Sequence, residues 1–294
     1  VVYMFSAPVE WLANKIVKSV QEVYEKSTIV LRLEPQIFNL MIIAGPGTET
    51  LIKNYPNLKQ YQSIPENIFD SENISTDDWP YLYLRTHSIS SYYFIAIGVL
   101  LLTSCAALFL LFRRNKYALF QWSSLTFFCL GVGFLLLETV SITRLSLLFG
   151  STWVVNSFVF TGILLMVLLA NIVVSRIKTI HLGWVYTGLA LTLALNYFLP
   201  ISSFIGGGFW IQYLTPAFIT TLPIFFASII FSYNFRSVKD IALLYGINLI
   251  GAVFGGFLEY GSMITGLRFL YIVAIIIYAT SYFAHKRQDS IVER

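Results

Sequence analysis

The chain has 294 residues, of which 57% are hydrophobic and 12% are charged, against about 25% charged in ordinary soluble domains. This composition excludes a typical soluble globular protein. The formal net charge is +4, but the Lys and Arg residues lie mainly in the connections between apolar stretches, so we expect no nucleic-acid partner.

The first 90 residues differ from the rest and predict a partial α/β segment. Apolar residues at helical spacing predict a helix over Val9–Lys26, with Pro8 suited to its first turn. The neighbouring apolar runs predict three strands and a short second helix: Val1–Ala7, Thr28–Leu33, Ile37–Ala44 and Thr48–Tyr55. This is too small for a complete doubly wound domain, so residues 1–90 and 91–294 are predicted to form two different domains.

A glycine-rich sequence, Gly45–Thr50, follows the third predicted strand and resembles a phosphate-binding loop only superficially. It lacks the third glycine of GxGxxG, and Pro46 removes a backbone donor that a phosphate would need. We therefore predict a plain turn and no cofactor site. The cysteines and histidines have no zinc-ligand spacing, so no metal site is predicted either.

Asp77 and Asp78 precede Trp79-Pro80 and the first apolar span. As sequence neighbours they need not share a face, so their pairing does not imply a catalytic dyad. A turn or a helix cap is the favoured interpretation, and a contact with a substrate amine is the alternative.

Residues 91–294 predict a mainly α, polytopic helical membrane bundle of about seven spans. The stretch from Ala118 to Gly150 can hold one long helix or a helix with a re-entrant turn. The predicted spans are Tyr92–Phe112, Ala118–Leu137, Val154–Val174, Leu182–Leu199, Leu214–Phe231, Ile241–Leu258 and Phe269–Phe283.

The basic residues are distributed unequally between the two sets of connections, which predicts a cytoplasmic C-terminus. With seven spans, residues 1–90 would then lie outside. One set carries only Arg85, Arg144 and Arg268. The other carries Arg113, Arg114, Lys116, Arg176, Lys178, Arg236, Lys239, Lys286, Arg287 and Arg294.

Two acids, Glu138 and Glu259, lie inside the apolar half of the chain, each directly after the last residue of a predicted span. A carboxylate at membrane depth costs several kcal/mol unless it is paired or hydrated, so each is a candidate functional residue. Arg144 and Arg268 are the candidate partners. Glu138 and Arg144 are six residues apart, on different faces of one helix, so we expect the crossed pairs Glu138–Arg268 and Glu259–Arg144.

Two sequence blocks carry a family resemblance. The junction Thr76–Arg85 (TDDWPYLYLR) leads directly into a span, and Gly131–Glu138 (GVGFLLLE) and Leu244–Gly251 (LYGINLIG) lie in the membrane part. These blocks resemble bacterial membrane proteins in which a spermidine-synthase-like or methyltransferase-like domain is fused to membrane spans. Residues 1–90 resemble the closing strands of that Rossmann-type domain.

The resemblance implies an integral protein of the bacterial inner membrane, with the lipid bilayer and the upstream part of the same protein as partners and a homo-oligomer as one arrangement. It implies S-adenosylmethionine, or its decarboxylated form, as cofactor of the full-length protein. The cofactor loop and catalytic acid of the family would lie before Val1, so no cofactor site is expected in this fragment. A cofactor-binding domain should face the cytosol, which conflicts with the charge pattern. Either one span is miscounted or the domain does not use the cofactor.

Three functions follow from these observations. The first is a membrane-embedded transferase acting on a small amine or lipid-linked acceptor, of which this chain is the C-terminal part and by itself inactive. The second is a transporter of a small solute or ion that uses Glu138 and Glu259. The third is a structural membrane anchor.

Overall fold

The computed structural model contains two compact units, Val1–Ser88 and Ile89–Arg294. The structure describes the chain except residues 25–27, 33–37, 62–73, 113–120, 151–152, 205–207, 209, 237, 239 and 293–294.

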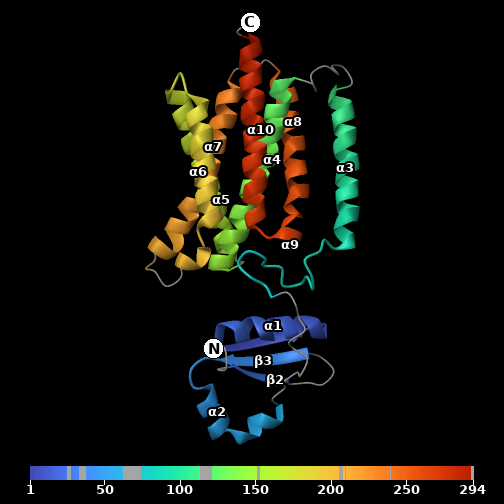
Figure 1. Cartoon of the computed structure of the whole chain (residues 1–294), viewed down its shortest axis with the longest axis vertical. Helices are drawn as coiled ribbons and strands as arrows, with labels where there is room; N and C mark the ends of the chain where they lie inside the picture. Colours follow the sequence, from blue (N-terminus) through green and yellow to red (C-terminus); the bar gives the residue numbers. More distant parts are fainter. Residues whose placement is uncertain are drawn as a thin grey trace. The chain divides into compact units, whose positions relative to one another are not determined.

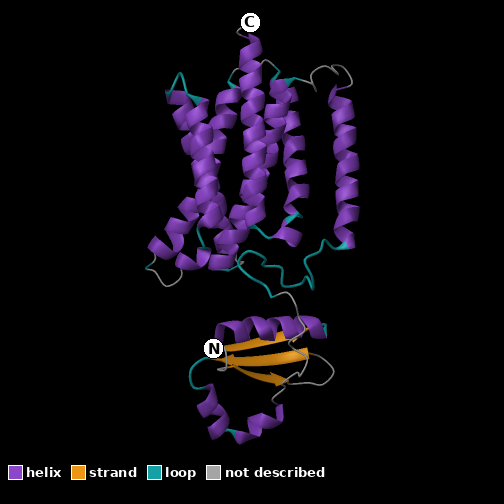
Figure 2. Ribbon diagram, viewed as in Figure 1, coloured by secondary structure: helices purple, strands orange, loops and turns teal. Residues whose placement is uncertain are grey.

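The first unit is a three-stranded sheet with a helix on one face (Figure 2). Strand β1 (Val2–Ala7) leads into helix α1 (Glu10–Tyr24), which is followed by β2 (Thr28–Arg32) and β3 (Phe38–Ala44). The strand order is β1-β3-β2, and β3 is antiparallel to both neighbours. Strands β1 and β2 are therefore parallel to each other and are joined by a helical crossover, the connection that parallel strands require.

The two faces of this sheet are buried to different extents. Side chains of β1, β2 and β3 that alternate towards α1, among them Ala7, Val30 and Ile42, form a core with the apolar face of the helix. On the opposite face, Val2 and Met4 of β1 are 55% and 70% exposed. The sheet thus has one covered face and one apolar face that is open along β1.

A buried lysine joins α1 to the segment that ends the first unit. Lys15 is 1% exposed, and its Nζ donates hydrogen bonds of 2.8 Å to the carbonyl oxygens of Tyr81 and Leu84. The same ammonium lies 4.2 Å from the ring centroid of Trp79, which stacks on His87 at 4.1 Å. Burial lowers the pKa of Lys15 from 10.5 to about 8.

This lowered pKa makes the stability of the first unit dependent on pH. In the unfolded chain Lys15 keeps its ordinary pKa, so between about pH 8 and 10.5 the unfolded state binds more protons and stability rises with pH. We expect resistance of the unit to pulse proteolysis in urea to increase from pH 7.5 to 9.5 in the full chain. Lys15→Met should lose this increase and lower stability by about 1–3 kcal/mol, because two carbonyls lose their donor. Parallel pH profiles for the two proteins would contradict this role.

The second unit is mainly α-helical, as predicted (Figure 1). The predicted spans correspond to α3 (Ser91–Phe112), α4 (Trp122–Phe149), α5 (Trp153–Arg176), α6 (Leu182–Phe198), α7 (Thr215–Phe235), α8 (Ile241–Glu259) and α10 (Arg268–Val292). Short helical segments of this unit cover Ile201–Phe204, Trp210–Leu214 and Ser262–Thr265 (α9), and those of the first unit cover Thr48–Asn54 (α2) and Pro56–Tyr61.

Five helical segments are long and apolar enough to cross a membrane: Trp122–Phe149, Val159–Arg176, Ile211–Phe235, Ile241–Thr265 and Arg268–Gln288. The stretches Ser91–Ser104 and Leu182–Phe198 are apolar but shorter. These lengths and compositions, taken from the described part of the chain, indicate an integral membrane protein.

Helix α4 is the centre of the second unit. It is one continuous helix of 28 residues, about 42 Å long at 1.5 Å per residue, so the described part of the Ala118–Gly150 stretch contains no re-entrant turn. It contacts α5, α7, α8 and α10 (Figure 1), and much of its surface is buried. Side chains on α4 therefore face the interior of the bundle from several directions.

Glycines allow α4 and α8 to pack backbone against backbone. A Cβ at Gly251 would overlap the carbonyl group of Phe128, and one at Gly131 would overlap that of Asn248. At Gly255 a Cβ would lie 2.7 Å from the carbonyl oxygen of Val132. The close helix approach that the Gly251–Gly255 spacing indicates is confirmed, with α4 as the partner.

We expect Gly251→Ala to separate α4 from α8 and to lower stability by about 2 kcal/mol or more, because backbone atoms on α4 cannot move as a side chain can. Gly98→Ala in α3 is the matched control, since nothing lies within 4 Å of the added Cβ there. It should be neutral or stabilising by up to about 1 kcal/mol. Thermal unfolding in detergent measures both, and equal effects would contradict the packing argument.

Candidate functional site

A cavity of about 620 Å³, open on one side, lies in the second unit between α4, α5, α7, α8 and α10, and its lining includes the exposed residues Asn171, Tyr245 and Leu249. Its walls are mostly apolar, and Leu130, Phe134, Val167, Phe231 and Leu249 are among them. The polar lining comes from all five helices: Glu138, Asn171, Ser175, Ser228, Ser232, Arg236, Tyr245, Asn248 and Tyr278. An apolar cavity with a few convergent polar groups is the usual form of a small-molecule site.

Glu138 is the only acid among the residues that line this cavity. It is half-buried near the middle of α4, and no hydrogen bond or ion pair joins its carboxylate to another described residue. Two other lining residues, Ser228 and Tyr278, have hydroxyls without a partner among the described residues. Both hydroxyl oxygens are buried and have almost no surface in the cavity, so the Glu138 carboxylate is the lining group with unused capacity for a ligand.

The asparagines around the cavity serve the packing of the helices. Asn171 Oδ1 accepts a 2.6 Å hydrogen bond from Ser232 Oγ, which joins α5 to α7. Asn248 Nδ2 donates to the Phe127 carbonyl at 3.0 Å, which joins α8 to α4. Both asparagines therefore link neighbouring helices.

Arg144, which is 6% exposed, binds neutral oxygens and not a carboxylate. Its Nη1 donates to the carbonyl of Asn196 at 2.6 Å and to the Tyr271 hydroxyl at 3.1 Å, and its Nη2 donates to the carbonyl of Leu199 at 2.7 Å. The predicted pair Glu259–Arg144 is therefore wrong. The guanidinium instead satisfies backbone carbonyls at the end of α6.

Two prolines explain why the backbone carbonyls of Asn196 and Ile219 accept hydrogen bonds from side chains. The Asn196 carbonyl would accept from residue 200, but Pro200 has no N–H, and Arg144 donates in its place. Pro223 inside α7 likewise leaves the Ile219 carbonyl without its helical donor. Asn196 Nδ2 donates to this oxygen at 2.9 Å. Arg144 and Asn196 thus supply the two hydrogen-bond donors that Pro200 and Pro223 remove.

A double-mutant cycle tests whether Asn196 compensates for the donor that Pro223 removes. Asn196→Leu should cost about 1–3 kcal/mol, because the Ile219 carbonyl becomes a buried acceptor without a donor. In a Pro223→Ala background residue 223 regains its N–H, so the same change should cost about 1 kcal/mol less. Thermal or detergent-induced unfolding supplies the four stabilities. Additive effects within about 0.5 kcal/mol would contradict the relation.

The second predicted pair, Glu138–Arg268, is also wrong, since Glu138 has no ion pair with any described residue. Arg268 is exposed at the first position of α10. Glu259 is the half-buried last residue of α8, and its backbone carbonyl accepts from Ser262 Oγ. It does not line the Glu138 cavity, so the two acids do not share one site.

The structure places Asp77 and Asp78 in a bend of the first unit, with Asp77 exposed and Asp78 partly buried. Thr76 closes this turn: its backbone N–H donates to the Trp79 carbonyl at 3.1 Å, and its Oγ1 accepts from the Trp79 N–H at 3.0 Å. Gly45 and Gly47 have positive φ of 128° and 99°, which fits a glycine turn before α2.

Sequence reasoning missed Ser228, Tyr278 and Arg236 as parts of the cavity. No local pattern marks them, because a serine or tyrosine in a span is common and each comes from a different place in the chain. The role of Arg144 did have a signal: Pro200 follows a span directly, and a carbonyl four residues before a proline always lacks its helical donor. Within the described residues, no group of three or more His, Cys, Asp or Glu could hold a metal ion.

Comparisons with known proteins give no relative for this chain: no family model, curated protein or solved structure matches it significantly.

Proposed function

We propose that the helical unit binds an amine-bearing small molecule in the membrane and passes it across, with Glu138 as the counter-charge. The observation that supports this most is the Glu138 carboxylate, which lines a mostly apolar cavity and has no ion pair or hydrogen bond with another described residue. A carboxylate at membrane depth is costly unless a cation or water reaches it, and such residues mark substrate and ion paths.

The composition of the cavity favours an amine with an apolar part. An ammonium group donates three hydrogen bonds, and charge-assisted bonds to a carboxylate are the strong ones. The phenyl and aliphatic walls suit an alkyl chain. A cavity of about 620 Å³ lies within the usual range for a small ligand, about 300–1,000 Å³.

Thermal stabilisation by matched ligands tests the binding step. The purified protein is melted with octylamine and with octanol, which share the alkyl chain and differ in charge. At a hundredfold excess over its Kd, a ligand stabilises the folded state by about 2.7 kcal/mol. We expect octylamine to raise the melting temperature more than octanol, and Glu138→Gln to abolish this difference. Uptake of a radiolabelled alkylamine by proteoliposomes should fall with the same variant.

Glu259→Gln is the matched control, because it neutralises a half-buried acid that does not line the cavity. It should keep the difference between amine and alcohol. Equal responses of the wild type to octylamine and octanol would contradict a cation site. Binding without uptake would support binding and refute transport.

For the membrane arrangement, we infer that α3 and α6 cross the bilayer together with the five longer helical segments, which gives seven spans. The excess of basic residues at one set of helix ends supports a cytoplasmic C-terminus. A bacterial inner membrane is the proposed location. Cysteine accessibility at Ser290, an exposed residue near the end of α10, tests the orientation in sealed vesicles.

The first unit favours a second candidate function, membership of a spermidine-synthase-like transferase. Two parallel strands joined by a helical crossover are the unit from which open α/β sheets are built, and such sheets can carry an antiparallel strand. The apolar face with exposed Val2 and Met4 supports a larger, doubly covered sheet. In this proposal S-adenosylmethionine or its decarboxylated form donates a group to a small amine or a lipid-linked acceptor. It requires residues 1–90 to face the cytosol, where the cofactor is, and therefore a span count other than seven.

Calorimetry with both sulfonium cofactors tests the transferase proposal. The chain of residues 1–294 should not bind either, because its glycine turn precedes a helix of only seven residues and lacks the third glycine. A protein in which this chain is joined to a complete Rossmann-type domain should bind with micromolar affinity. Absence of binding by that protein would refute the transferase proposal and leave the transport proposal intact.

A further inference from the structure

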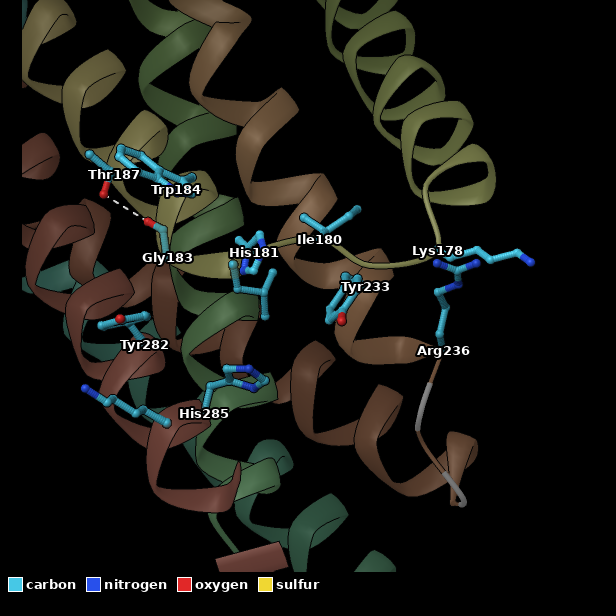
Figure 3. Close-up of a pocket in the computed structure, with 12 residues that line it drawn as sticks. Lys178, Ile180, His181, Gly183, Trp184, Thr187, Tyr233, Arg236, Tyr282 and His285 are labelled. Atoms are coloured by element: carbon cyan, nitrogen blue, oxygen red, sulfur yellow. Dashed lines mark hydrogen bonds between the residues drawn. The ribbon is translucent and has the colours of Figure 1, made fainter. Parts of the chain in front are cut away.

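A second cavity, of about 890 Å³, lies at the helix ends of the second unit (Figure 3). Its lining comes from the α5–α6 connection, the first turns of α6, the end of α7 and the last turns of α10. It is separate from the Glu138 cavity except that Arg236 lines both. Nothing derived above assigns a role to it.

The ionisable groups of this cavity are basic. Lys178, Arg236 and Lys286 line it together with His181 and His285, and no Asp or Glu is among the lining residues. Figure 3 shows Lys178 and Arg236 together at one end, with His181 and His285 further along the cavity. Arg236 is held in place by a hydrogen bond from Nη1 to the Ile177 carbonyl at 3.1 Å. Because the described lining residues include three cations and no acid, they give the cavity a positive potential.

The same cavity has aromatic walls at the depth where a span ends. Trp184, Tyr233 and Tyr282 contribute to the lining, and Trp184 is 78% exposed. Trp and Tyr at span ends are typical of the interface between hydrocarbon and lipid headgroups. The combination of basic side chains and interfacial aromatics is therefore positioned at the level of phosphate groups.

We propose that this cavity, defined by Lys178, His181, Arg236, His285 and Lys286, is a binding site for a phosphate-ester anion, supplied by the headgroup of an anionic phospholipid. Lys and Arg recognise phosphate through charge-assisted hydrogen bonds, Arg with two donors at once. Basic pockets between spans are known to accept anionic headgroups. The volume accommodates a headgroup with its first glycerol carbons, and the aromatic wall accommodates the start of an acyl chain.

Two measurements distinguish a lipid from a soluble phosphate. Native mass spectrometry of the full chain, released from nanodiscs of phosphatidylcholine with phosphatidylglycerol, should show retained phosphatidylglycerol. Isothermal titration of the protein in phosphatidylcholine nanodiscs with glycerol 3-phosphate tests the soluble source. Retention of lipid alone identifies the lipid, and heat from glycerol 3-phosphate identifies a free phosphate ester at the same site. Failure of both overturns the proposal.

The double variant Lys178→Gln/Lys286→Gln should reduce retention or affinity about thirtyfold, because each basic residue near an anionic headgroup contributes a factor of about five. Both residues are exposed, so the fold should not depend on them. Arg176→Gln/Arg287→Gln is the matched control: it removes two exposed cations from the same helix ends, and neither lines the cavity. An equal loss of lipid retention or affinity in both double variants would show that general surface charge attracts the anion. That result would overturn the proposal of a specific site. Alkylamine binding at Glu138 should be unchanged in either variant.

Discussion

The helical unit depends on one constraint, that a backbone carbonyl in hydrocarbon must find a donor inside the protein. Pro200 and Pro223 each remove such a donor, at the end of α6 and inside α7. Arg144 and Asn196 replace the missing donors, and the Tyr271 hydroxyl completes the coordination of the guanidinium. These groups come from α4, α6, α7 and α10. The hydrogen bonds that satisfy the two carbonyls therefore also fix the relative positions of these four helices.

The two charged side chains of α4, Arg144 and Glu138, differ in whether the protein supplies hydrogen-bond partners for them. Arg144 has three neutral acceptors within hydrogen-bonding distance, so its charge is solvated by the protein. Glu138, less than two turns away on another face of the same helix, has none among the described residues and borders a cavity. The scaffold therefore holds a carboxylate in place without neutralising it. An unsatisfied group on a rigid element is what a binding site for a cation requires.

Composition and periodicity predicted the helices well, because long apolar runs leave few alternatives for backbone hydrogen bonds in a membrane. The strands and α1 of the first unit were also predicted to within a few residues. The ion pairs were not predicted. The prediction assumed that opposite charges form ion pairs. Arg144 instead donates to carbonyls at the end of α6, among them the Asn196 carbonyl, which Pro200 leaves without a helical donor. The cavity was out of reach because it arises from five helices whose mutual arrangement is set by contacts such as the Gly251–Phe128 approach.

The position of α4 in the chain has a consequence for how the protein is made. Arg144 precedes Asn196, its first acceptor, by 52 residues, and α8, which packs on the α4 glycines, is synthesised later still. At a synthesis rate of about 5–20 residues per second, the guanidinium waits roughly 3–10 s before its acceptor is made. During that interval α4 contains an arginine and a glutamate without intramolecular compensation. The insertion machinery must therefore retain this helix, or keep it at a hydrated interface, until the second half of the bundle arrives.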